Sequence, residues 1–358
     1  MPSLKEIKGR INSISSTLAI TSAMKMVAAA KLQKAQMAIQ NMLPYERRLH
    51  SMLIDLMGAM NISAAASEDG SVRGSGSAER GFDQSGDRLS LSNRHDLAGM
   101  DGAYSLMAQR EVRKVAIVAF ASNSSLCGAF NSNVIREATA VINEYRASGL
   151  GDADITVYSV GRKMAEAMKK LGFPSPADFT KMSDSPSYDA ASALAQELFD
   201  GFASGRFDKV ELVYNHYKST SSQPTTRQTY LPLSLADATA DLQAGKITDP
   251  ASETDTNRVA EPVGAPVVRQ GSPTTEDLIV EPSKEALIAT LLPKVIRLRI
   301  FTTLLDSAAA EHAARTVAMQ LATDNGNDLL QELTLEYNKG RQQKITSEIL
   351  DLVGGSMQ

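Results

Sequence analysis

The C-terminal part of the chain carries an apolar stripe that constrains the fold more than any other feature. Between residues 293 and 353, apolar side chains recur in steps of three and four, the spacing of one helical face. The stripe consists of Val295, Leu298, Phe301, Leu305, Val317, Leu321, Leu329, Leu333, Tyr337, Ile345, Ile349 and Leu352. Pro293 suits a first helical position, and Gly354 and Gly355 are expected to end the helix. At ~1.5 Å per residue such a helix is about 90 Å long, so it needs an equally long partner.

The N-terminal part of the chain offers that partner. Residues 3 to 42 predict a helix that opens with a capping box, in which Ser3 and Glu6 each satisfy a backbone N–H of the other. Its apolar stripe slips once near residue 21 and consists of Leu4, Ile7, Ile11, Ile14, Leu18, Met24, Val27 or Ala28, Leu32, Ala35 and Ile39. Pro44 is expected to end or kink this helix, and a further amphipathic segment follows. The two terminal stripes together predict an antiparallel two-helix coiled coil.

The N-terminal helix is strongly basic, although the whole chain has a net charge of −4. Residues 1–50 hold eight basic and two acidic side chains, a local net charge of +6. The basic residues are Lys5, Lys8, Arg10, Lys25, Lys31, Lys34, Arg47 and Arg48. A solvated face is the ordinary explanation for such a run. A basic rod with a narrow apolar seam, however, favours an acidic partner around it, and the overall charge argues against nucleic acid as a partner.

Strand and helix patterns alternate between the two terminal helices. The nearly continuous apolar run from Val112 to Ser122 is typical of a buried parallel strand. Further strands are predicted at 155–160 and 210–217, helices at 133–148, 162–171 and 188–203, and an extended edge segment at 225–235. This alternation predicts a central Rossmann-like α/β domain over residues 109–235, with a mainly parallel sheet.

Two segments of different composition interrupt the pattern. Residues 62–108 are rich in Ser, Gly, Asp and Arg, and residues 236–275 in Asp, Thr, Ala and Pro, so both are predicted to be mobile insertions. The remaining boundaries place a shaft helix with a following helical segment at 1–61. A return segment occupies 276–292, with a short strand and then a helix that Ser283 can cap and that leads through Pro293 into the shaft. The C-terminal shaft helix occupies 293–353.

Patterns that would carry catalysis or hold a metal are weak. The single cysteine, Cys127, rules out an intrachain disulfide and a zinc cluster of cysteines, and the four histidines are scattered. Loop 123–133 lies where α/β folds often bind phosphate, but Gly128 is its only glycine. No His or carboxylate is placed beside Cys127 by the sequence. We therefore expect no catalytic residue, cofactor or metal. An enzyme built on the α/β domain and a coiled-coil adaptor remain the alternatives.

The sequence predicts no direct membrane insertion. It contains no run of ~18 apolar residues, and its first residues lack the apolar region of a secretory signal. These features predict a cytoplasmic chain that could reach a membrane through a partner.

Five stretches of the chain form recognisable motifs. They are Ile7-Lys-Gly-Arg-Ile, Ile20-Thr-Ser-Ala-Met-Lys-Met-Val-Ala-Ala-Ala-Lys, Leu126-Cys-Gly-Ala-Phe-Asn-Ser-Asn, Glu311-His-Ala-Ala-Arg-Thr-Val-Ala-Met and Asn338-Lys-Gly-Arg-Gln-Gln-Lys-Ile-Thr-Ser-Glu-Ile. Together these motifs resemble the family of gamma subunits of F-type ATP synthases. The resemblance spans the chain apart from the two insertions. It implies a non-catalytic central rotor shaft that couples rotation of a proton-driven membrane ring to ATP synthesis at beta-subunit sites. It also implies a peripheral position on the cytoplasmic face of the bacterial inner membrane.

The resemblance further implies partners and contact residues. Three alpha and three beta subunits would surround the coiled coil, and the epsilon subunit and the membrane c-ring would meet the α/β domain. Contacts with beta-subunit loops and the opposite shaft helix are implied for Met24, Lys25, Arg315, Arg341, Gln342, Thr346 and Glu348. An apolar bearing tip is implied for Ile345, Ile349, Leu352 and Val353. For each residue a solvated helix face is the plain alternative.

The chain also departs from the pattern that this family commonly shows. Ser122-Asn-Ser-Ser stands where the family commonly has Ser-Asp-Arg-Gly, which removes two charges and a glycine. Lys25 stands where an acidic residue is frequent. An ion pair made by the loop is therefore not expected here.

Overall fold

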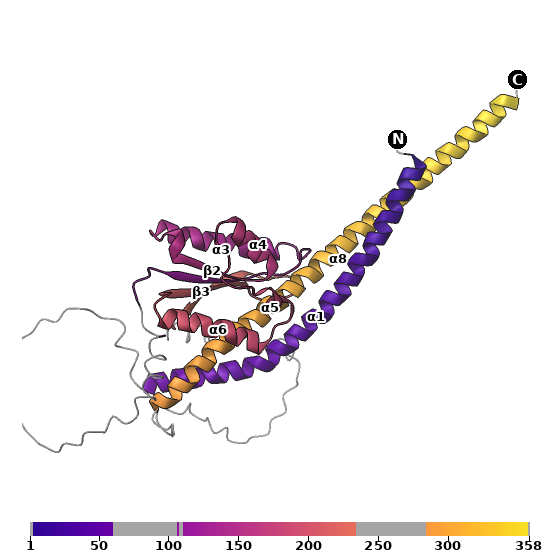
Figure 1. Ribbon diagram of the computed structural model, residues 1–358. Coiled ribbons are helices and arrows are strands. Elements are labelled where there is room, and N and C mark those ends of the chain that lie inside the picture. The colour runs from indigo at the N-terminus through magenta and orange to yellow at the C-terminus, as the bar shows by residue number, and fades with distance from the viewer. Residues whose placement is uncertain (1–2, 60–105, 107–109, 234–283, 357–358) are drawn as a thin grey trace, which may run out of the picture.

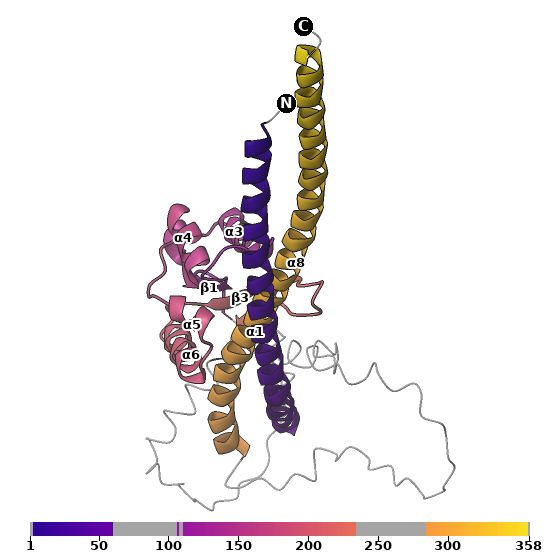
Figure 2. The same ribbon diagram turned by 90° about the vertical axis from the view of Figure 1, so that its right-hand side faces the viewer.

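The computed structural model describes residues 3–59, 106, 110–233 and 284–356. Two long helices, α1 (Leu4–Ala59) and α8 (Lys284–Ser356), lie side by side and form a rod, and an α/β domain packs against one part of it (Figures 1 and 2). Both chain ends lie at the same end of the rod, where α8 extends beyond α1. The predicted insertions, apart from Leu106, and the short strand predicted before α8 lie outside the described residues.

Helix α1 contains 56 residues and continues through Pro44, so the prediction that the first helix stops near residue 42 is wrong. A proline inside a helix loses one backbone hydrogen bond and costs about 3 kcal/mol. Packing on both sides offsets this cost, because Leu49 and Leu53 are buried in the domain core and Met42 packs against it. Tertiary burial therefore outweighs the local signal of the proline.

Helix α8 contains 73 residues and begins at Lys284, which agrees with the helix expected to lead through Pro293 into the shaft, but it extends beyond both bounds, 293 and 353, that were predicted for the shaft helix itself. Pro293 lies inside the helix rather than at its start, because Leu291, Leu292 and Val295 are buried in the core of the α/β domain and hold the helix together there. At the other end the helix continues through Gly354 and Gly355 to Ser356. A glycine inside a helix costs only ~1 kcal/mol, so two glycines did not suffice to end the helix as expected.

The sheet has the strand order β2-β1-β3-β4. Strands β1 (Val115–Phe120), β2 (Ile155–Val160) and β3 (Lys209–Asn215) are parallel, and β4 (Thr225–Leu231) joins β3 antiparallel at the edge. All six side chains of β1 are buried, as a central strand covered on both faces requires. The predicted parallel sheet and its extended edge segment are thus confirmed.

Helices cover both faces of the sheet. On one face α3 (Phe130–Ala147) and α4 (Arg162–Lys170) pack against Val115, Ile117 and Ala119. On the other face α6 (Tyr188–Ala203) and the first part of α8 pack against Ala116, Val118 and Phe120. A short helix that the sequence did not predict, α5 (Thr180–Asp184), precedes α6, and a single turn, η2 (Asp152–Asp154), precedes β2.

Helix α8 therefore has two successive roles. Its first part is a core helix of the α/β domain, where Ile288, Leu292 and Ile296 are almost fully buried. Its later part leaves the domain and pairs with α1 (Figure 1). The fold class predicted from the sequence, a coiled coil of the chain ends joined to a central α/β domain, is confirmed.

Candidate functional site: the shaft surfaces and their joint with the α/β domain

The seam between α1 and α8 keeps one antiparallel register. A Cβ atom added to Gly326 would lie 2.6 Å from Leu18 Cδ2, and one added to Gly340 would lie 3.1 Å from Leu4 Cδ2. The spacing from Leu4 to Leu18 equals that from Gly326 to Gly340, about four helical turns. Near these pairs the hydroxyls of Thr21 and Thr323 lie 3.1 Å apart. Two glycines on α8 thus accommodate two leucines of α1.

The end of α8 extends beyond this seam. Gly340 is paired with Leu4, the first residue of α1, so residues 341–356 continue as a single helix about 24 Å long. The four residues implied to form a bearing tip are exposed: Ile345 (47%), Ile349 (54%), Leu352 (74%) and Val353 (53%). Apolar side chains this exposed on a lone helix are suited to contact another protein.

The polar residues implied to make coupling contacts occupy two environments. Arg341, Gln342, Thr346 and Glu348 are exposed, and the contacts of Thr346 and Glu348 are with their own helix. Met24 and Lys25 are half-buried on α1. The seam near them uses Ala28 rather than Val27, because Ala28 is 2% exposed and Val27 is 58% exposed.

Arg315 occupies a different position from the other candidates, since it points into the protein. Its guanidinium donates to Glu311 Oε1 at 2.7 Å and to Ser124 Oγ at 2.7 Å. The side chains of Arg315 and Glu311 are only 11% and 9% exposed. Arg315 therefore fixes the loop after β1 to α8, and Ser124 serves as a neutral partner where the family commonly has charge.

Burial shifts the pKa values of two neighbours on α8. Burial raises the pKa of the Glu311 carboxyl, and the charge of Arg315 opposes this shift in part. Burial lowers the pKa of His312 from 6.5 to about 4, with further contributions from Arg315 and Lys31. His312 Nδ1 is buried without a hydrogen-bond partner. Both shifts favour the uncharged form at this junction.

The loop after β1 packs against α8 and contains no catalytic pair among its contacts. Cys127 is buried in a cluster with Phe130 and Ala310. The neighbours of its Sγ atom are the Asn131 amide at 3.2 Å and the Ser122 hydroxyl at 3.7 Å, and neither is a general base. This geometry gives the thiol a structural role.

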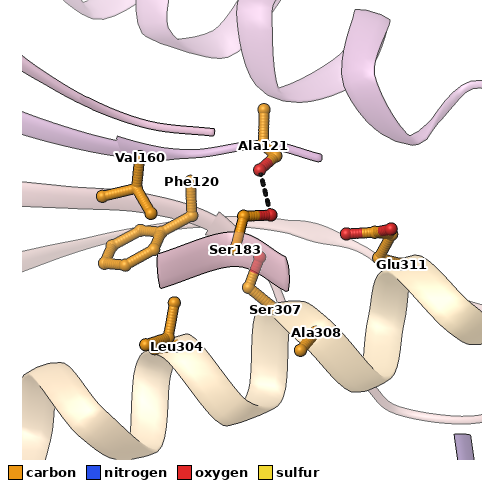
Figure 3. Close-up of a pocket in the computed structure, with 8 residues that line it drawn as sticks. All are labelled: Phe120, Ala121, Val160, Ser183, Leu304, Ser307, Ala308 and Glu311. Atoms are coloured by element: carbon orange, nitrogen blue, oxygen red, sulfur yellow. Dashed lines mark hydrogen bonds between the residues drawn. The ribbon is translucent and has the colours of Figure 1, made fainter. Parts of the chain in front are cut away.

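A small recess at the C-terminal ends of β1 and β2 has room for about one water molecule (Figure 3). Its lining residues are Phe120, Ala121, Val160, Ser183, Leu304, Ser307, Ala308 and Glu311. Ser183 of α5 donates a hydrogen bond to the Ala121 carbonyl at 3.0 Å (Figure 3). Ligands of α/β folds often bind outside these strand ends. Here α8 fills that position, so the domain supports a helix rather than a nucleotide.

A polar cluster after β3 is the feature that sequence reasoning missed. His216 and Tyr217 both contact Asp306 of α8, and Gln36 of α1 contacts Tyr217. These residues are polar, far apart in sequence and without a recognisable spacing. One signal was available: Gln36 and Asp306 each lie next to an apolar stripe at a point where a third element could approach.

Two further kinds of feature are absent from the part of the chain that the structure describes. No group of three or more His, Cys, Asp or Glu side chains there could hold a metal ion. None of the described helices combines the length and the apolar composition needed to cross a membrane.

Comparison with known proteins shows which family has sequences similar to this chain. A family model described as ATP synthase matches residues 3–357. The chain is 48% identical over 357 residues to the ATP synthase gamma chain of Phocaeicola vulgatus, with 100% of both chains covered. It is 45% identical over 358 residues to that of Bacteroides thetaiotaomicron, again with 100% of both covered. It is 36% identical over 356 residues to that of Flavobacterium johnsoniae, with 99% of this chain and 98% of the relative covered.

The fold also resembles a solved rotor structure, that of the Euglena gracilis mitochondrial ATP synthase in rotational state 1. The TM-score is 0.52 at 18% identity, and the match covers 96% of this chain and 98% of that chain. A long two-helix rod joined to an α/β domain is the fold that this chain shares with that structure. This chain belongs to the ATP synthase gamma-chain family. The resemblance noted in the sequence is thereby confirmed.

Proposed function

We propose that this chain is the central rotor shaft of an F-type ATP synthase. It transmits the rotation of a proton-driven membrane c-ring to ATP synthesis at the beta-subunit sites. Family membership along the whole chain supports this function. The observation that carries it is the end of α8, which continues past α1 as a lone helix with exposed apolar side chains.

The partners follow from the same proposal. Three alpha and three beta subunits surround the rod, and the epsilon subunit and the c-ring contact the α/β domain. The basic residues of α1 support an acidic surrounding surface, since Lys5, Lys8, Lys31 and Lys34 are all exposed. The chain is peripheral to the membrane, on the cytoplasmic face of the bacterial inner membrane, and reaches the membrane through the c-ring.

The shaft acts mechanically and forms or breaks no covalent bonds. Arg341, Gln342, Thr346 and Glu348 contact beta-subunit loops, as do Met24 and Lys25 lower on the rod. Ile345, Ile349, Leu352 and Val353 form the bearing tip. Arg315, which is mostly buried, instead holds the α/β domain against α8.

The proposal is tested by purifying the tagged chain from gently solubilised membranes and assaying ATP hydrolysis in the eluate. Alpha and beta subunits should co-elute with ATPase activity, and the isolated chain should hydrolyse no ATP. The same purification from cells that carry the untagged chain is the matched control and should recover neither subunit. Activity that stays with the lone chain would favour an enzyme. A stable homodimer indifferent to these subunits would favour an adaptor.

A further inference from the structure

The contact between the α/β domain and α8 after β3 depends on one carboxylate. Asp306 Oδ1 accepts a hydrogen bond from the Tyr217 backbone N–H at 2.8 Å, and Asp306 Oδ2 lies 2.7 Å from His216 Nδ1. The Asp306 side chain is only 18% exposed. A single residue of α8 thus fixes two consecutive residues of the domain.

The Tyr217 side chain extends the same contact to α1. Gln36 Nε2 donates a hydrogen bond to Tyr217 Oη at 2.6 Å. The Tyr217 ring packs against the cluster of Leu32, Ala309 and Ala313, which joins α1 to α8. It also packs against the cluster of Cys127, Phe130 and Ala310, which joins the loop after β1 to α8. One aromatic side chain therefore contacts both shaft helices and the domain.

Small residues predominate in the seam at this level. Its buried residues are Ala28 and Leu32 on α1 and Ala309 and Ala313 on α8. Alanine permits close approach but has no side chain that inserts between the turns of the facing helix, so Leu32 is the large side chain that α1 buries here. Farther along the rod, Leu18 and Leu4 lie against Gly326 and Gly340. Tyr217 packs against the Leu32 cluster and adds a further contact that holds α1 in place.

We propose that Tyr217, positioned by Asp306 and bonded to Gln36, is a torque joint that makes both shaft helices rotate with the α/β domain as one body. This role rests on the proposed rotor function and specifies how the rotor holds together. Torque enters the chain at the domain and leaves it along the coiled coil. If α1 could move against α8 at this level, part of each rotation would be lost as deformation. Tyr217 is a positioning residue, because it touches no reacting atom.

The test compares two Tyr→Phe variants in the complete membrane complex. Tyr217→Phe keeps the ring and removes the hydrogen bond to Gln36. Tyr230→Phe is the matched control, since Tyr230 Oη donates to the Ile296 carbonyl at 3.0 Å and so joins the domain to α8. Three quantities are measured: proton pumping per ATP hydrolysed in inverted vesicles, the KM for ATP, and hydrogen–deuterium exchange of the residue 217 amide.

The backbone amide at 217 keeps its bond to Asp306 in Tyr217→Phe, but residue 217 loses the side-chain bond to Gln36 and should open more easily. We therefore expect this amide to exchange about fivefold faster, the factor associated with loss of one hydrogen bond. Proton pumping per ATP should fall while the KM for ATP stays unchanged. Gln36→Ala should have the same effect, and combining it with Tyr217→Phe should add nothing, because both remove one interaction. Tyr230→Phe should leave pumping per ATP as in the wild type.

Three results would overturn the joint. The first is an unchanged exchange rate and pumping ratio in Tyr217→Phe. The second is an equal loss in Tyr217→Phe and Tyr230→Phe, which would mean general loosening of the domain. The third is additive losses in the double variant. A wild-type chain that supports no coupled pumping at all would instead remove the rotor function and the joint with it, so the two failures are distinguishable.

Discussion

His312 and Glu311 are neighbours on α8, and burial acts on their pKa values in opposite directions. The pKa of Glu311 is raised and that of His312 is lowered to about 4. In both cases the uncharged form is favoured, while Arg315 alone supplies a charged hydrogen bond to the loop after β1. These single residues lie where the domain is held against the shaft. Because their pKa values are shifted in the folded chain, their ionisation can be measured as a pH dependence of the free energy of unfolding.

We expect His312→Gln to flatten the pH dependence of stability between about 6.5 and 4. Within this window the unfolded chain binds a proton at residue 312 and the folded chain does not, so the free energy of unfolding falls as the pH falls. Glutamine removes that contribution and leaves the opposite contribution of Glu311 unchanged. Urea unfolding followed by circular dichroism at several pH values provides the measurement. Parallel curves for the two proteins would contradict the assignment.

Gly326→Ala tests the seam at a single atom. Alanine favours a helix over glycine by about 1 kcal/mol. The added Cβ at Gly326, however, would lie 2.6 Å from Leu18 Cδ2, and overpacking of this kind costs ~1–3 kcal/mol. Gly9→Ala is the control, because nothing lies within 4 Å of a Cβ there. We expect thermal unfolding to show stabilisation by Gly9→Ala and none by Gly326→Ala. Equal gains would mean that α1 and α8 are not held in this register.

At the scale of elements, the sequence predicted well what local pattern determines. The apolar run of β1 is continuous because both faces of the sheet are covered, and β1, β2 and β3 were all located to within a few residues. The ends of the two long helices were predicted less well. Pro44 is a local signal for a helix end and Pro293 for a helix start, but burial of residues on both sides of each proline overrides these signals. Local propensity cannot express this tertiary contribution.

Among the candidate functional residues, too, those on a regular local pattern could be predicted and those brought together by tertiary packing could not. The exposed tip and the seam residues could be predicted, because each lies on a stripe with regular spacing. The joint of Gln36, Tyr217 and Asp306 could not, since its members are isolated polar residues brought together by the packing of three elements. Arg315 was among the residues implied to make coupling contacts. Its side chain points toward the domain because it bonds to Ser124, which is distant in sequence.

Glu211 links β3, β4 and α3, and its replacement tests how these elements hold together. Glu211 is 1% exposed. Its carboxylate lies 2.7 Å from Lys209 Nζ and 2.7 Å from Arg227 Nε, and it accepts a hydrogen bond from the Tyr145 hydroxyl at 2.6 Å. Burial alone would raise its pKa, but these hydrogen bonds lower it overall. The stability that Glu211 provides is therefore present above pH 4.5 and is lost as the pH falls through its folded-state pKa.

We expect Glu211→Gln to lower the free energy of unfolding at neutral pH by about 3 kcal/mol, because two cations would lose their buried partner. The variant should also lose less stability than the wild type on acidification. Glu111→Gln is the control, since the Glu111–Arg113 pair is exposed and its loss should leave stability unchanged. Chemical unfolding at pH 7 and at pH 4 measures both effects. A variant as stable as the wild type at pH 7 would show that the cluster is dispensable.

At the scale of the whole molecule, one helix joins the two functions of the chain. The first part of α8 is a core element of the α/β domain, its middle pairs with α1, and its end is solitary (Figure 2). A rotation applied to the domain is therefore applied directly to the helix that ends in the exposed tip. The α/β domain uses the carboxyl ends of its strands, where many such folds bind ligands, to hold this helix.

Arg341→Ala combined with Gln342→Ala tests the polar contacts just beyond the seam. Each exposed contact contributes only ~0–1 kcal/mol, so the complex should still assemble. ATP-driven proton pumping should nevertheless drop, because these side chains are exposed where the lone helix begins and would meet the beta-subunit loops there. Pumping in inverted vesicles, normalised to the amount of assembled complex, is the measurement. Pumping at the wild-type level would count against both residues as coupling contacts.

Truncation after Gln342 tests the bearing tip, and the register of the seam makes this test selective. Gly340, the partner of Leu4, is retained, so the chain should unfold at the same temperature as the wild type. The exposed apolar side chains of Ile345, Ile349 and Leu352 are removed, and with them the area that can be buried against a surrounding sleeve. The shaft should therefore dissociate faster from the alpha and beta subunits, and pumping per ATP should fall. Truncation after Val353 keeps these side chains and should preserve both properties. If the shorter chain dissociated and pumped like the longer one, the end of α8 would not be a bearing, and rotation would have to be transmitted by the two-helix part of the rod alone.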